Sequence, residues 1–61
     1  MRYRDVARAL EAEGWTAIRQ TGSHVIFERE GRICPVPNHG SKDLKIGTVV
    51  SIERITGVKL R

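Results

Sequence analysis

The sequence predicts an α+β fold in the order α-β-β-β-α, with a three-stranded antiparallel sheet and both helices on one face of the sheet. Three observations predict this fold. Apolar residues recur at helical spacing near both ends of the chain. Three short segments between them are rich in residues that favour strands. Short turn sequences join these segments, as they do between consecutive antiparallel strands.

The first helix is expected over residues 4–13. Apolar side chains recur there at the i, i+3 and i+4 spacing of one helix face, at Val6, Ala9 and Leu10. Asp5 suits the first turn, where a carboxylate meets the positive end of the helix dipole. Gly14 is placed to end the helix in the left-handed conformation, which glycine adopts without a steric penalty.

Three strands are expected next. They cover residues 15–20, 24–29 and 32–36, with turns at residues 21–23 and 30–31. In the middle strand Val25 and Phe27 share one face. The residues on its other face are His24, Ile26 and Glu28. Pro35 has no backbone N–H, so the third strand is expected either at an edge of the sheet or bulged at that residue.

The last third of the sequence predicts a loop and a second helix. Residues 37–41 have the composition of a loop, and residues 42–47 continue it with basic side chains. Thr48 is expected to cap the helix, and Gly57 to close it. The apolar positions of this helix are Val49, Ile52 and Ile55. With both helices on one face of the sheet, the opposite face is free to bind a partner.

The size and composition of the chain exclude several classes of protein. Residues 1–61 are expected to form one domain, because a chain of this length buries only about 60% of the surface that its unfolded form exposes. A single cysteine excludes an internal disulfide, and two histidines add too few ligands for a Cys/His zinc site. No apolar run approaches the roughly 20 residues of a membrane span, and the N-terminus lacks the apolar stretch of a signal peptide. We therefore expect a cytoplasmic protein without metal, cofactor or membrane contact.

The net charge of +4 lies entirely in the second half of the chain. Residues 1–31 hold five basic and five acidic side chains, whereas residues 32–61 hold six basic and two acidic ones. This asymmetry favours a polyanionic partner, because cationic side chains that contact phosphates release bound counterions. A basic surface that serves only solubility is the alternative.

His24 and His39 are the candidate proton-transfer residues, because histidine is the side chain whose ordinary pKa suits proton transfer at neutral pH. RNA carries its own nucleophile, the 2′-hydroxyl, so its cleavage needs only a base, an acid and cations that hold the phosphate. A structural or surface role is the alternative for His24, and a turn-forming role is the alternative for His39. Cys34 is either a thiolate nucleophile or a small buried residue of the third strand. Trp15 and Tyr3 offer base stacking, and core packing is the alternative for Trp15.

Five segments carry a resemblance to a known family. They are Leu-Glu-Ala-Glu-Gly-Trp at residues 10–15, Arg-Gln-Thr-Gly-Ser-His at residues 19–24, Val-Pro-Asn-His-Gly at residues 36–40, Lys-Asp-Leu-Lys at residues 42–45 and Gly-Thr-Val-Val-Ser-Ile at residues 47–52. In this order they resemble the HicA toxin family, the mRNA interferases of bacterial and archaeal toxin–antitoxin systems. The resemblance covers essentially the whole chain, and three of its motifs in order within so short a chain make it specific.

The resemblance implies a fold like that of double-stranded-RNA-binding domains, cleavage of mRNA and neutralisation by a HicB-like antitoxin. The histidine of Gly-Ser-His is catalytic in the family, which implies this role for His24. Ser23 is then expected to help fix His24, and His39 to contact the substrate. The candidate phosphate contacts are Arg32, Lys42 and Lys45.

The sequence departs from the family pattern at two places. Pro35 interrupts the third strand, and Val49 and Val50 stand where relatives commonly have leucine and a basic residue. Neither departure falls on Gly-Ser-His. Two alternatives to a nuclease remain open: a non-catalytic RNA-binding module of the same fold, and a subunit that binds only a partner protein.

Overall fold

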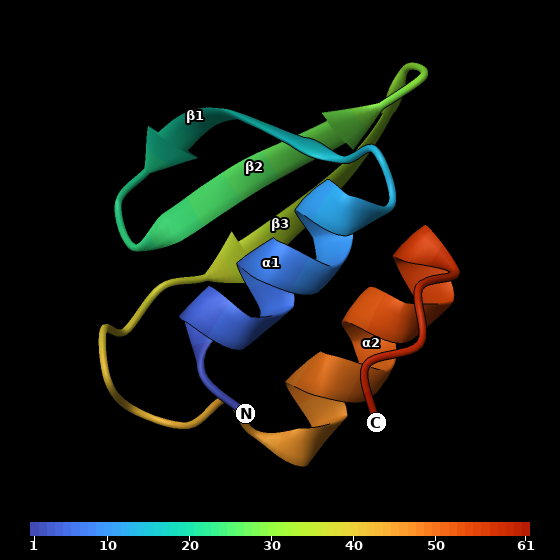
Figure 1. Cartoon of the computed structure of the whole chain (residues 1–61). Helices are drawn as coiled ribbons and strands as arrows, with labels where there is room; N and C mark the ends of the chain where they lie inside the picture. The colour runs from blue at the N-terminus through green and yellow to red at the C-terminus, as the bar shows by residue number, and fades with distance from the viewer.

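The computed structural model describes all 61 residues and has the expected α-β-β-β-α order (Figure 1). Its elements are α1 (Tyr3–Ala12), β1 (Thr16–Thr21), β2 (His24–Arg29), β3 (Arg32–Pro37) and α2 (Ile46–Thr56). The strands form one antiparallel sheet in the order β1-β2-β3, so β2 is the central strand. The predicted fold class is confirmed. No helix is long and apolar enough to cross a membrane.

The register of the sheet defines two faces. Val25 and Phe27 of β2 lie on the inner face, and their partners on β3 are Val36 and Cys34. His24 lies on the outer face, at the end of the sheet where β3 finishes and opposite Pro37. The register of β1 against β2 shifts between Ala17 and Arg19, which leaves Ile18 as a bulge.

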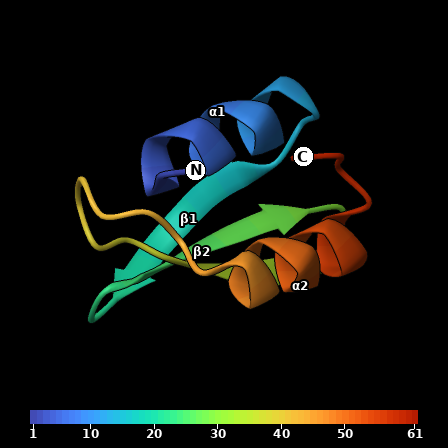
Figure 2. The same cartoon turned by 90° about the horizontal axis from the view of Figure 1, so that it is seen from below.

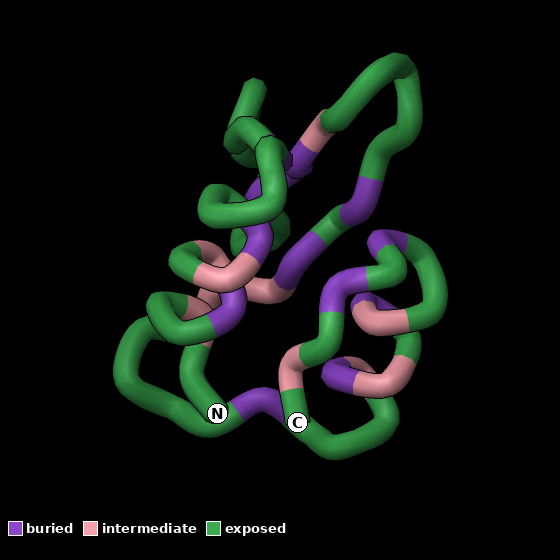
Figure 3. The backbone as a smooth tube through the Cα atoms, turned by 45° about the vertical axis from the view of Figure 1, so that its right-hand side comes forward, coloured by how far each residue is buried: buried purple, intermediate pink, exposed green.

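Both helices pack on the inner face of the sheet, as expected. One buried cluster joins side chains of the helices, the strands and the segments that connect or follow them, and its members are Val6, Leu10, Trp15, Val25, Phe27, Cys34, Val36, Leu44, Val49, Ile52 and Val58. Figure 3 shows these buried positions where helices and strands face one another, with exposed turns and loops around them. Both helices begin at the same end of the molecule, beside the loop that links β3 to α2 (Figures 1 and 2).

Three details of the predicted elements are confirmed. Gly14 and Gly57 follow the two helices with φ angles of 90° and 74°, in the left-handed region that favours glycine. The N–H of Arg2 donates to the Asp5 carboxylate (2.9 Å) at the start of α1, which places this acid in the first turn. Pro35 lies on β3, an edge strand, and the register of β3 against β2 has no bulge.

The predicted start of the second helix was wrong. The N-cap of α2 is Lys45, which has an extended backbone, and its carbonyl oxygen accepts the N–H groups of Thr48 (3.0 Å) and Val49 (3.1 Å). Thr48 therefore lies inside the first turn. The physical reason is tertiary: Leu44 is buried in the core and donates its N–H to the carbonyl of Met1 (2.7 Å), which fixes the chain one residue before the cap.

Candidate functional site

His24 is exposed at the start of β2, on the sheet face that neither helix covers. Its neighbours across the sheet are Thr21 on β1 and Pro37 on β3. No hydrogen bond or ion pair within the chain engages its imidazole ring, so both ring nitrogens are open to a ligand. This environment permits proton transfer to a bound molecule.

The loop over residues 38–45 lies directly beside His24. The N–H of Asn38 donates to the carbonyl oxygen of Ser23 at 2.6 Å, so the loop leaves β3 in contact with the turn that carries His24. The Asn38 side chain then accepts the N–H of Gly40 (3.1 Å), which closes a compact turn around His39. The Ser23 backbone thus anchors the loop, and the expected support of His24 by Ser23 stays a prediction.

The loop brings His39, Lys42 and Lys45 to one open pocket of about 410 Å³. The rest of its lining consists of Pro37, Asp43, Leu44 and Thr48. Neither lysine forms an ion pair with a carboxylate of the chain. Three of the six residues selected from the sequence therefore share one pocket, with Ser23 and His24 on the adjoining turn.

Arg32 does not belong to this group. It begins β3, whereas His24 lies opposite the last residue of that strand, Pro37, about 17 Å away along an extended backbone. Its guanidinium donates to the carbonyl oxygen of Ile55 and lies 5.8 Å from the centre of the Trp15 ring. These contacts hold α2 against the sheet, so the structure gives Arg32 a packing role, and we do not include it in the candidate site.

Arg2 and Arg4 were not predicted from the sequence as site residues. Both line a second hollow, of about 200 Å³, together with Gly40 and Ser41 of the same loop. Their place in a basic site could not be predicted, because residues 1–31 have no net charge and because nothing in the local sequence predicts that this segment contacts the loop. An antiparallel bridge between Arg2 and Asp43 makes that contact.

Three other candidates are accounted for by packing. Cys34 is completely buried on the inner face of the sheet, and burial raises the pKa of its thiol, which disfavours a thiolate nucleophile. Trp15 is also buried in the core. Tyr3 packs against Phe27 with ring centres 6.4 Å apart, and burial, followed by the negative charge of Glu11, raises the pKa of its hydroxyl.

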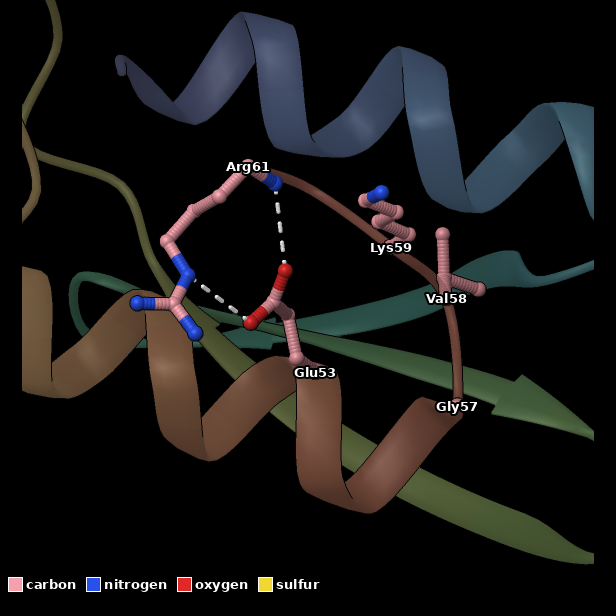
Figure 4. Close-up of a pocket in the computed structure, with 5 residues that line it drawn as sticks. All are labelled: Glu53, Gly57, Val58, Lys59 and Arg61. Carbon is pink, nitrogen blue, oxygen red and sulfur yellow. Dashed lines mark hydrogen bonds and ion pairs between the residues drawn. The ribbon is translucent and has the colours of Figure 1, made fainter.

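A third hollow lies at the C-terminal end of the chain and is lined by Glu53, Gly57, Val58, Lys59 and Arg61 (Figure 4). The Glu53 carboxylate accepts the N–H groups of Leu60 (2.7 Å) and Arg61 (3.1 Å) and also pairs with the Arg61 side chain (3.1 Å). The carboxylate of Glu53 thus holds the C-terminal residues Leu60 and Arg61 against α2. No group of three or more His, Cys, Asp or Glu side chains is placed to hold a metal ion.

Comparison with known proteins identifies the family. A family model described as the HicA toxin of bacterial toxin–antitoxin systems matches residues 3–58, from the start of α1 to beyond the end of α2. No curated protein and no solved structure matches the chain. The family match spans both helices, all three strands and the whole candidate site, and the chain therefore belongs to the HicA toxin family, the toxins of bacterial toxin–antitoxin systems.

Proposed function

We propose that this toxin is a metal-independent endoribonuclease that cleaves mRNA in the cytoplasm, with His24 as a general acid or base. The observation that carries the proposal is the hydrogen bond between Asn38 and Ser23, which holds a loop with two unpaired lysines beside an exposed histidine. An acid–base group and cations at one surface are what phosphodiester cleavage by the 2′-hydroxyl requires.

The proposed reaction is an internal displacement at phosphorus. The 2′-oxygen loses its proton and bonds to the adjacent phosphorus, while the bond from phosphorus to the 5′-oxygen of the next nucleotide breaks. That leaving oxygen takes up a proton. The products are a 2′,3′-cyclic phosphate and a 5′-hydroxyl, and no water or metal enters the bond-making step. His24 performs one of the two proton transfers, and His39 or solvent performs the other.

The lysines of the loop supply electrostatic stabilisation. Negative charge builds up on the phosphate oxygens during the displacement, and cations that already face this position lower the barrier without reorganisation. Lys42 and Lys45 line the pocket beside His24, and the chain provides neither with a carboxylate partner. We assign them to the phosphate, and we place His39 in the same pocket as a substrate contact that is also within reach of the second proton transfer.

Membership of the family implies an antitoxin partner. We propose that a HicB-like antitoxin binds the outer face of the sheet and covers His24. This face carries exposed apolar surface: the Ile33 side chain is 52% exposed, and Pro35 beside it is exposed as well. An antitoxin that covers this surface would block the substrate without unfolding the toxin.

The decisive experiment is incubation of purified His24→Ala and wild-type protein with a transcript in excess EDTA. We expect the wild type to cleave and the variant to lose about 10² to 10⁴ in rate, the usual contribution of a positioned acid–base group. Because the side chain is exposed, the variant should keep its stability within about 0.5 kcal/mol. Wild-type product ends should be 2′,3′-cyclic phosphate and 5′-hydroxyl.

His39→Ala serves as the matched comparison. A smaller loss than that of His24→Ala assigns His39 to substrate contact, and an equal loss assigns it the second proton transfer. Cleavage that stops on chelation, or 5′-phosphate ends, would contradict the metal-independent mechanism. A wild-type protein that binds RNA and leaves it intact would instead establish the non-catalytic RNA-binding module.

A further inference from the structure

The hollow formed by Arg2, Arg4, Gly40 and Ser41 has the composition of an anion site. None of its lining residues is hydrophobic, and two of the four carry a guanidinium group. Arginine suits phosphate because its planar donors match the phosphate oxygens in pairs. Gly40 and Ser41 contribute little side-chain bulk, so the backbone of the loop is accessible next to the two arginines.

Tertiary contacts fix this hollow to the candidate active site. Arg2 pairs with Asp43 in an antiparallel bridge, and the N–H of Leu44 donates to the carbonyl of Met1 at 2.7 Å. The backbone of Arg2 is also held at the start of α1 by the Asp5 carboxylate. The same loop is held at its other end by the bond from Asn38 to Ser23. One short loop therefore connects His24 with the two arginines.

The arginines are available to a ligand. Neither Arg2 nor Arg4 forms an ion pair with a carboxylate of the chain. The Asp5 carboxylate accepts the backbone N–H of Arg2, which is the main cause of the lowered pKa of this carboxyl, and the charges of Arg4 and Arg2 contribute less. Asp43 lines the other pocket, on the side of Lys42 and Lys45.

We propose that Arg2 and Arg4 form a second phosphate-binding site for single-stranded RNA. A strand whose scissile phosphate lies at His24 crosses the loop and places another of its backbone phosphates against the two arginines. The seven residues 38–44 span at most about 25 Å, so the two phosphates lie within one short stretch of RNA. This proposal rests on the proposed nuclease function, and it makes Arg2 and Arg4 positioning residues that set where along the strand the cut falls.

The test measures the salt dependence of binding to a single-stranded RNA oligonucleotide methylated at every 2′-oxygen, which cannot be cleaved. Fluorescence anisotropy at a series of KCl concentrations gives the slope of log affinity against log salt. The double variant, Arg2→Gln with Arg4→Gln, should reduce that slope by about 0.7, because one phosphate is no longer neutralised and keeps its counterion, and each single variant should reduce it by less. Cleavage of a longer transcript by the double variant should slow and shift among sites.

The matched control is Arg54→Gln, which removes an exposed arginine from the last turn of α2, at the opposite end of that helix from the loop. It should leave the slope unchanged. The double lysine variant, Arg2→Lys with Arg4→Lys, keeps both charges and should keep the slope, which separates charge loss from any loss of folding.

A double glutamine variant that is folded and retains the wild-type slope would overturn this site. If the wild type still cleaves and His24→Ala does not, only the Arg2 and Arg4 site falls and the nuclease function stands. A wild-type protein with neither cleavage nor salt-dependent binding would overturn both.

Discussion

The backbone N–H of Asn38 lies 2.6 Å from the carbonyl oxygen of Ser23 and donates a hydrogen bond to it. This bond joins two loops that are separated in the sequence by the whole of β2 and β3. On one side of it stands the exposed His24, and on the other side the loop turns toward His39 and the lysines. The chemistry proposed for this toxin depends on that junction, because neither segment alone combines a proton-transfer group with phosphate-binding cations.

Asn38→Pro removes the donor of this bond and should weaken the site more than the fold. The loss of one hydrogen bond costs about 1 kcal/mol of unfolding free energy, measurable by urea denaturation. A loop displaced by about 1 Å from the reacting groups can cost about 10²-fold in rate, so we expect a loss of that order in transcript cleavage.

Asn38→Ala is the control for this substitution, because it keeps the backbone N–H and removes only the side-chain bond to Gly40. We expect a smaller loss of cleavage than for Asn38→Pro. If the proline variant cleaves at the wild-type rate, the loop over residues 38–45 is not part of the active site.

The sequence alone was sufficient for the features that depend on local patterns. The alternation along β2 correctly separated Val25 and Phe27 from His24, because side chains on a strand point to opposite faces in turn. Gly14 and Gly57 marked the ends of the helices for an equally local reason, their tolerance of the left-handed conformation. Neither inference required knowledge of what packs against the element.

The features that the sequence did not predict depend on contacts between distant residues. Arg32 was predicted to contact phosphate, but its guanidinium donates a hydrogen bond to the carbonyl oxygen of Ile55 and lies over the Trp15 ring. Arg2 joins the loop only because it pairs with Asp43, which is 41 positions away in the sequence. Such pairings are set by how the helices dock on the sheet, and no local spacing reports them.

The turn between β2 and β3 contains a residue whose replacement should stabilise the folded protein. Glu30 has a φ of 53° and is the one non-glycine residue with positive φ, followed by Gly31 at 83°. This two-residue turn favours Asn-Gly, because asparagine tolerates the left-handed conformation better than glutamate. Glu30→Asn should therefore stabilise the protein by about 1 kcal/mol, which raises Tm by about 4–8 °C in a domain of this size.

The control for that gain is Glu30→Ala, which removes the exposed ion pair with Arg29 (3.8 Å) and keeps an unfavourable residue in the turn. Exposed pairs of this kind contribute little, so Tm should change by no more than a few degrees. A Tm for Glu30→Asn at or below that of the wild type would show that the turn is not a source of strain. Cleavage should be unaffected, since this turn lies at the opposite end of β2 from His24.

The contacts of Glu53 with the C-terminal residues make the stability of the toxin depend on pH. The N–H of Leu60 is the main cause of the lowered pKa of the Glu53 carboxyl in the folded state, and contacts with Arg61 add to it. A carboxyl whose folded pKa lies below its unfolded value of about 4.3 stabilises the fold above that pH. This contribution is lost as the pH falls through the folded pKa, so Tm should decline below about pH 4.

Glu53→Gln should lower Tm at neutral pH and flatten the decline of Tm in acid. The amide oxygen can still accept the N–H groups of Leu60 and Arg61, but the side chain has no negative charge that protonation could remove. Thermal melts between pH 2 and pH 7 measure both effects. Some acid dependence should remain in this variant, because the pKa of Asp5 is also lowered in the folded state, mainly by the N–H of Arg2. Glu13→Gln removes a carboxylate that accepts no hydrogen bond from the chain, so it should leave the wild-type curve unchanged. If Glu53→Gln keeps the full acid slope of the wild type, Glu53 is not the group whose protonation loosens the C-terminal segment.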